Sequence, residues 1–224
     1  MPARPGRAMV RRMYFDTPGF DLLLFQLINQ HWHADLLNGL MRLLSSRAAL
    51  FALFIPALLL AVRRLGKRQL VLFAVLLLAM GLTDMSTSLV KNEVRRVRPL
   101  NSLPNTYCVE DGTWVQRPAD FTPTKTEGSS YPSGHAANSM CLAALALLLW
   151  PRMRPSLRAG LLLLPLLVGY SRVYLGKHFP TDVLAGWLFG LVVAVLVGLA
   201  WREWGEERLG NRTREPGPPP GASD

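Results

Sequence analysis

Residues 171–182 read SRVYLGKHFPTD and connect two strongly apolar segments of the chain. A membrane protein ordinarily has a plain turn between such segments, but this connection contains an Arg, a Lys, a His and an Asp. His178 followed by Asp182 is typical of a nucleophile or base with an orienting carboxylate, and Arg172 would supply a fixed cation for an anionic substrate. A charged turn at a membrane interface would have the same composition, so the rest of the chain must decide.

The apolar residues are gathered in long blocks instead of recurring with a regular period. Of the 224 residues, 50% are hydrophobic and only 18% are charged. Such blocks, flanked by charges, are typical of transmembrane helices, although a soluble bundle with very apolar core helices is an alternative. We therefore predict an all-α, polytopic membrane bundle of about six transmembrane helices, near residues 20–44, 48–62, 69–90, 132–150, 159–171 and 182–201.

The first of these segments, 20–44, is the least regular, because several polar side chains interrupt it. It could cross the bilayer with a polar face inside the bundle, or lie in the interface. We expect it to cross. His31 and His33 are two residues apart and would point to different sides of a helix, and Cys108 and Cys141 form no metal pattern. We expect neither a metal nor a cofactor, and the pairing of the cysteines is not determined by the sequence.

The domain organisation follows from composition. Residues 1–19 are basic and contain no removable signal peptide, so we expect a cytoplasmic N-terminus. Residues 20–201 form the membrane domain, which includes a loop at 100–131 of a length that is usually functional. Residues 202–224 end in a Pro- and Gly-rich stretch that cannot form a packed core, and we expect a disordered cytoplasmic tail.

Charge indicates both the orientation and the partners. The turns 63–68 and 151–158 are basic and should be cytoplasmic, which leaves 91–133 and 172–181 together at the outer face. The net charge of +10 fits basic cytoplasmic loops and an anionic ligand. Apolar spans separate the basic residues, which argues against nucleic acid. We expect membrane lipids and an anionic lipid substrate as partners, and the oligomeric state stays open.

Two of the predicted helices have informative faces. The polar residues of the third recur at helical spacing, so we expect one face, turned toward the site, that carries Asp84, Ser88, Lys91, Arg95 and Arg98. Pro99 disfavours helix in the residue before it, which predicts a helix end at Arg98. In the last helix, Gly186 and Gly190 predict a close contact with a neighbouring helix.

Three motifs therefore meet at the outer face: K-x6-R-P from Lys91, P-S-G-H from Pro132, and S-R-x5-H-x3-D from Ser171. In this order they resemble the type 2 phosphatidic acid phosphatase superfamily of membrane lipid phosphatases, whose site is related to that of vanadium haloperoxidases. The resemblance covers residues 91–182 by motif, and the rest by the number and placing of spans. It implies a metal-independent hydrolase of phosphoric esters or anhydrides that forms a phosphohistidine intermediate.

The resemblance also implies a role for each site residue. His178 would attack phosphorus, Asp182 would hold its tautomer, and His135 would protonate the departing oxygen and then activate water. Phosphoryl transfer spreads negative charge over the equatorial oxygens, so it needs preorganised cations and amide donors. The residues that would bind the phosphate are Lys91, Arg98, Ser133, Gly134 and Arg172, of which Ser133 and Gly134 begin a helix.

By analogy with bacterial enzymes of this family, we expect undecaprenyl diphosphate as the substrate. Phosphatidylglycerophosphate, phosphatidic acid and lipid A phosphates are alternatives, because the motifs bind only the shared phosphate. A lipid scramblase or transporter would also place cations at one face but would not need the His178–Asp182 pair. A haloperoxidase would use the same residues for vanadate, but the known ones are soluble. We expect a protein of the bacterial inner membrane with its site toward the periplasm.

Overall fold

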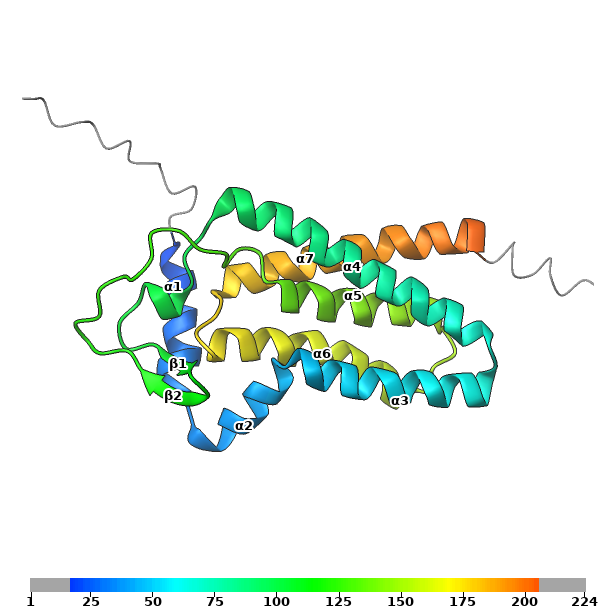
Figure 1. Ribbon diagram of the computed structural model, residues 1–224, viewed down its shortest axis with the longest axis horizontal. Helices are drawn as coiled ribbons and strands as arrows, with labels where there is room; N and C mark the ends of the chain where they lie inside the picture. Colours follow the sequence, from blue (N-terminus) through cyan, green and yellow to red (C-terminus); the bar gives the residue numbers. More distant parts are fainter. Residues whose placement is uncertain (1–16, 206–224) are drawn as a thin grey trace, which may run out of the picture.

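The computed structural model describes residues 17–205, and most of them are helical. Five long helices run along the long axis in alternating directions (Figure 1). They are α3 (Arg47–Leu65), α4 (Arg68–Val94), α5 (Gly134–Leu149), α6 (Pro155–Tyr174) and α7 (Pro180–Ala200), the last continued by the π-helical segment η3 (Trp201–Gly205). Short turns after α3 and α5 force this antiparallel order.

The long helices have the length and the apolar surface that a membrane-spanning helix requires. Within residues 17–205, three helical stretches are long and apolar enough to cross a bilayer, 68–101, 155–174 and 180–205, and α5 is a shorter apolar helix. Large apolar side chains on these helices point outward, among them Leu78, Leu188 and Leu196, each more than 60% exposed. In water such a surface would aggregate, whereas lipid covers it without cost. The predicted helical membrane bundle is confirmed.

Glycines let α5 and α7 approach closely. A Cβ atom on Gly190 would lie 2.0 Å from the carbonyl oxygen of Ala137, and one on Gly186 would lie 2.4 Å from that of Ser133. Neither distance leaves room for a side chain, so only glycine permits this packing. The predicted close contact at Gly186 and Gly190 is confirmed, and it brings the first turn of α5 against the first turn of α7.

The expected crossing at 20–44 is wrong. The segment breaks into α1 (Gly19–Gln26), the π-helical η1 (Leu27–His31) and α2 (Asp35–Leu44). At 1.5 Å per residue, α1 and η1 together reach only about 20 Å, less than a bilayer core of about 30 Å. The polar residues explain the break: Asn29 is fully buried and bonds the backbone of Tyr107 in the loop and of Tyr174 at the end of α6, so it is fixed at the end of the bundle. Figure 1 shows α1 lying across one end of the bundle.

This break changes where the chain enters the bundle. Thr17 accepts a hydrogen bond from Arg96, just beyond the end of α4, at 3.2 Å. Residues 17–19 therefore lie at the end of the bundle opposite to the turns 63–68 and 151–158, so they do not share one side with these turns as we had expected. The remainder of the expected basic N-terminus, residues 1–16, and most of the expected tail, residues 206–224, lie outside the described residues.

The loop at 100–131 contains structure that we did not predict. After the 3-10 turn η2 (Pro99–Asn101), strands β1 (Tyr107–Glu110) and β2 (Thr113–Gln116) pair antiparallel. Asp111 and Gly112 both have positive φ and close the hairpin, as an Asp-Gly pair commonly does. The hairpin lies at the same end of the bundle as α1 (Figure 1), and Tyr107 in β1 bonds Asn29 of η1. Cys108 in β1 and Cys141 in α5 are both buried free thiols.

Candidate active site

The end of α4 differs from the prediction. The helix ends at Val94, because Arg95 adopts a left-handed conformation with φ of 53°. Arg95 is consequently exposed and pairs with Glu127, so it does not share the face of Lys91. Arg98 follows in an extended conformation, as a residue before proline prefers, but the helix end itself lies upstream. The unpredicted consequence is that Arg96 turns inward and is buried.

The start of α7 is held by local capping. Pro180 occupies the first helical position, where its missing N–H costs nothing. The Asp182 carboxylate, two residues further, accepts a hydrogen bond from the backbone N–H of Phe179 at 2.8 Å. An acidic side chain at this position stabilises the helix start. His178 therefore lies on a short connection that is anchored to α7 immediately after it.

His178 has a direct partner that was not predicted. Its Nδ1 lies 2.7 Å from the carbonyl oxygen of Ser130, whereas the nearer Asp182 oxygen is 3.6 Å away, beyond hydrogen-bond distance. The carbonyl can only accept, so Nδ1 carries the proton and Nε2 keeps its lone pair. We had expected Asp182 to hold the tautomer, but the direct hydrogen bond to Nδ1 comes from the backbone of Ser130.

Burial keeps His178 neutral. The side chain is 3% exposed, and burial is the main reason that its pKa falls to about 4. The Asp182 carboxylate opposes this shift, while the guanidinium groups of Arg172 and Arg98 add to it. An imidazole with this pKa is unprotonated at neutral pH, which is the state that a nucleophile needs.

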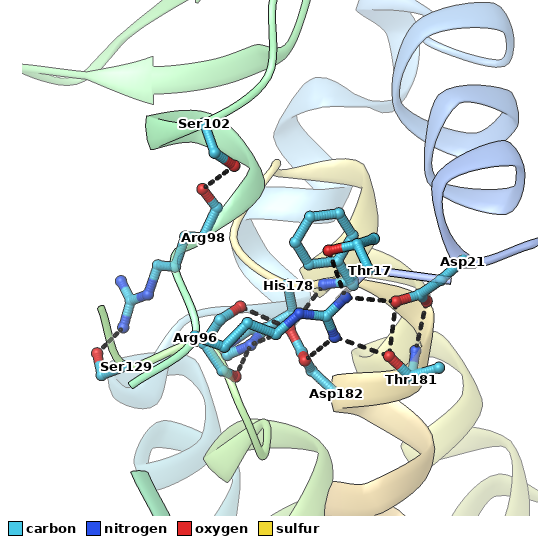
Figure 2. A network of polar contacts seen from close by, with 11 residues as sticks. Thr17, Asp21, Arg96, Arg98, Ser102, Ser129, His178, Thr181 and Asp182 are labelled. Atoms are coloured by element: carbon cyan, nitrogen blue, oxygen red, sulfur yellow. Dashed lines mark hydrogen bonds and ion pairs between the residues drawn. The ribbon is translucent and has the colours of Figure 1, made fainter. Parts of the chain in front are cut away.

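Asp182 is the centre of a buried polar network, which Figure 2 shows from close by. One carboxylate oxygen accepts from the Ser130 hydroxyl at 2.5 Å, and the other accepts from Arg96 Nη1 at 2.6 Å. Arg96 Nη2 bonds Asp21 of α1, also at 2.6 Å. The carboxylate of Asp182 thus fixes Ser130, which in turn holds His178, so it orients the imidazole through an intermediate group.

The first turn of α5 meets this network. Ser133 donates its backbone N–H to the carbonyl of Asp182 at 2.8 Å. We had expected this amide to bind phosphate, but it is not available for that contact. The Ser133 hydroxyl oxygen is buried and has no hydrogen-bond partner in the described part of the chain. A Cβ on Gly134 would lie only 3.1 Å from Lys91 Nζ, so the lysine reaches the helix start. Together these groups favour an anion at this point.

The two arginines of the site come from different directions. Arg172 lies in the last turn of α6, is 5% exposed, and donates a hydrogen bond to the hydroxyl of Ser45 at the end of α2. Arg98 donates to the hydroxyl of Ser129 at 3.2 Å. Both act on the electrostatics of His178. The structure therefore gathers at one end of the bundle the residues predicted to be catalytic and phosphate-binding: Lys91, Arg98, Ser133, Gly134, His135, Arg172, His178 and Asp182.

A cavity of about 650 Å³ extends from His135 along the bundle. At the end near the site, Asp84 and Asn138 line it and are joined by a hydrogen bond of 2.8 Å. The prediction that Asp84 faces the site is confirmed by this position beside His135. Toward the other end the lining comes from α3, α4, α5 and α6 and is apolar, including Phe54, Phe73, Leu142, Trp150 and Leu161.

Sequence reasoning missed several residues that hold the site side chains, namely Asp21, Arg96, Ser130 and Thr181 around Asp182, and Ser45 beside Arg172. Arg96 offered a weak signal, because it is an additional arginine inside the K-x6-R-P motif, two residues before Arg98. Asp21 offered another, because an acidic residue in an apolar segment needs a partner. Ser45 and Ser130 offered none, since a serine in a connection is ordinary.

Comparisons with known proteins agree with this geometry. The family model described as the PAP2 superfamily matches residues 70–205, more than half of the chain. The chain belongs to the PAP2 superfamily. Among PAP2 relatives, an undecaprenyl-diphosphatase of Sulfolobus acidocaldarius is 37% identical over 180 residues, which cover 80% of this chain and 77% of the relative. A phosphatidylglycerophosphatase B of Bacillus subtilis is 40% identical over 95 residues, 38% of this chain and 46% of the relative.

Solved PAP2 structures share the fold. The crystal structure of Aquifex aeolicus LpxE superposes with a TM-score of 0.60 at 24% identity, covering 83% of this chain and 97% of that one. A transmembrane PAP2 phosphatidylglycerolphosphate phosphatase from Bacillus subtilis gives 0.58 at 25% identity, covering 83% and 86%. With its apolar helices, this membership makes the chain an integral membrane lipid phosphatase of the PAP2 superfamily.

Proposed function

We propose that this PAP2 phosphatase hydrolyses undecaprenyl diphosphate through a phosphohistidine on His178, at the outer face of the bacterial inner membrane. The observation that carries the mechanism is the hydrogen bond from His178 Nδ1 to the Ser130 carbonyl, because it leaves Nε2 as a neutral nucleophile. The substrate rests on the similarity to the Sulfolobus enzyme, which extends over most of both chains.

In the first step, His178 Nε2 attacks the terminal phosphorus in line with the bond to the departing oxygen. That bond breaks as the N–P bond forms, and the charge on the equatorial oxygens is stabilised by Lys91, Arg98 and Arg172. The Ser133 hydroxyl and the first amides of α5 supply neutral donors. His135, the second residue of α5, protonates the departing oxygen where that oxygen needs a proton.

In the second step, His135, neutral after its proton has passed to the departing group or to solvent, accepts a proton from water, and the resulting hydroxide attacks the phosphohistidine. The N–P bond breaks, and inorganic phosphate and free His178 are formed. Asp182 contributes in both steps by fixing Ser130 and Arg96 and by stabilising the charge that develops on the imidazole. The positive charge on His178 in the intermediate is thus compensated by the Asp182 carboxylate.

The apolar cavity supports a lipid substrate. It begins at His135, where the leaving group would lie, and continues past Leu142 toward Trp150. A hydrocarbon chain in this space would exchange contact with lipid for contact with α3 to α6, while the phosphate stays at the polar end. We therefore place the first isoprene units of the substrate in this cavity.

The test is phosphate release by the purified enzyme from a panel of lipids in the same detergent. We expect the highest kcat/KM with undecaprenyl diphosphate, and lower values with phosphatidylglycerophosphate, phosphatidic acid and a lipid A phosphate. Release should persist in EDTA, because Lys91, Arg98 and Arg172 provide the charges proposed to bind phosphate, and vanadate should block it. A clear preference for phosphatidylglycerophosphate would replace the proposed substrate but leave the mechanism in place.

The orientation is a separate prediction. The basic turns 63–68 and 151–158 lie at the end opposite the site, and the positive-inside rule places them in the cytoplasm. In a background with Cys108→Ala and Cys141→Ala, a cysteine at the exposed Thr122 should react with an impermeant thiol reagent in intact cells. Lys67→Cys is the matched control and should react only after the membrane is broken. The reverse pattern would turn the site inward.

A further inference from the structure

The contact between α1 and the catalytic network is not explained by the proposed chemistry. Asp21 is fully buried, yet it lies far in sequence from every motif residue and touches none of the groups proposed to bind phosphate. One carboxylate oxygen accepts from the backbone N–H of Thr181 at 2.9 Å. The other accepts from the Thr181 hydroxyl at 2.7 Å and from Arg96 at 2.6 Å. Figure 2 shows Asp21 facing Asp182 across the Arg96 guanidinium.

Arg96 is shared between two carboxylates. Nη1 bonds Asp182 and Nη2 bonds Asp21, and the guanidinium side chain is only 2% exposed. Two buried carboxylates would repel each other, and each would be costly to bury alone, so a cation between them is required. Because each nitrogen has its own acceptor, the plane of the guanidinium is determined by both acids. Moving either acid would change what the other one contacts.

The same arrangement holds the residue next to the nucleophile. The guanidinium carbon of Arg96 lies 4.0 Å from the centre of the Phe179 ring, and the Phe179 backbone N–H donates to Asp182. Phe179 is therefore fixed at its ring and at its backbone by two members of the network. His178 directly precedes it, so a displacement of Arg96 or Asp182 reaches the imidazole through one peptide unit.

We propose that Asp21 is a positioning residue for phosphoryl transfer: through Arg96 and Thr181 it fixes Asp182 and the connection that carries His178. In this arrangement α1 supports catalysis through Asp21, although none of its side chains is proposed to contact the substrate. The inference rests on the proposed role of His178 as nucleophile.

The first experiment measures kcat and KM for phosphate release by Asp21→Asn, per amount of folded, monodisperse protein. Asparagine keeps the size but replaces one acceptor oxygen with a donor that opposes Arg96. We expect kcat to fall on the order of 10- to 100-fold, as for a small misplacement of a reacting group, with KM changed less than about twofold. An unchanged kcat in folded protein would mean that Asp21 only stabilises the fold, and would overturn the inference.

Thr181 provides a milder variant that should fold. Thr181→Val removes the hydroxyl that bonds both Asp21 and Arg96 but keeps the shape, and it should lower kcat in the same way. Thr181→Ser restores the hydroxyl and should restore kcat. The matched control is Glu127→Gln, which breaks the exposed ion pair of the neighbouring Arg95 and should leave kcat unchanged. Equal losses in the valine and serine variants would count against a role of this hydroxyl.

The second experiment asks whether Asp21 acts through Asp182. In an Asp182→Asn background, the additional loss caused by Asp21→Asn should nearly vanish, because the group being positioned is gone. Losses that multiply independently would overturn the inference. Rapid-quench labelling separates it from the proposed function: if the wild type forms no phosphohistidine, the proposed mechanism fails, whereas a labelled wild type with equally fast labelling of Asp21→Asn refutes the inference alone.

Discussion

Replacing His135 with alanine should slow cleavage of a lipid monophosphate far more than cleavage of an isoprenyl diphosphate, whereas His178→Ala should abolish turnover of both. A monophosphate ester expels an alkoxide, which leaves poorly without a proton, so loss of the general acid should cost about 100-fold or more. A diphosphate expels a phosphate, which leaves readily without help. Removing His178 removes the bond-forming atom, and neither substrate can avoid that loss.

The measurement is a single-turnover reaction with each substrate. Single turnover is required because His135 is also proposed to activate water in the second step, and steady-state rates would mix the two roles. His135 lines the apolar cavity in which we propose that the lipid part of the substrate lies. Equal losses on the two substrates would show that His135 mainly binds phosphate, and its assigned role would then be wrong.

The sequence predicted those features that depend on the type of a single residue or on a short stretch of residues. The apolar blocks and the motif residues can be recognised in the sequence alone. A bilayer-spanning helix requires a long run of apolar residues, and a phosphate-binding site requires cationic residues at defined positions. Gly186 and Gly190 were predicted for the same reason: two glycines four residues apart in an apolar helix indicate a close contact with a neighbouring helix. These signals sufficed to place both histidines and the cations at one end of the bundle.

The errors arose where tertiary contacts decided the outcome. Asn29 is compatible with a crossing helix until β1 is known to need a partner for the backbone of Tyr107. Arg95 fits the face of α4 until the helix is seen to end before it. The role of the Ser130 carbonyl could not be predicted at all, since a backbone acceptor has no residue type. The polar network was missed for a similar reason: the role of Arg96 depends on its contacts with Asp21 and Asp182, which are both far from it in the sequence.

A single methyl group on Gly190 should disrupt the fold and the site together, and this is the largest structural effect we expect. In Gly190→Ala the added Cβ would lie 2.0 Å from the Ala137 carbonyl oxygen and 2.9 Å from the backbone N of Cys141. Both neighbours are backbone atoms, so the clash can be relieved only by moving α5 away from α7. Overpacking of this kind costs about 3 kcal/mol or more when the surroundings cannot adapt.

Phosphatase activity should be lost together with the packing, because the contact between α5 and α7 also includes the hydrogen bond from the Ser133 N–H to the Asp182 carbonyl. Gly160→Ala is the matched control: its Cβ would meet nothing within 4 Å, and alanine is the better helix former by up to about 1 kcal/mol. Thermal unfolding in one detergent should therefore show a lower midpoint for Gly190→Ala and an unchanged or higher one for Gly160→Ala. If Gly190→Ala unfolds at the wild-type temperature with full phosphatase activity, α5 and α7 do not pack as closely as described.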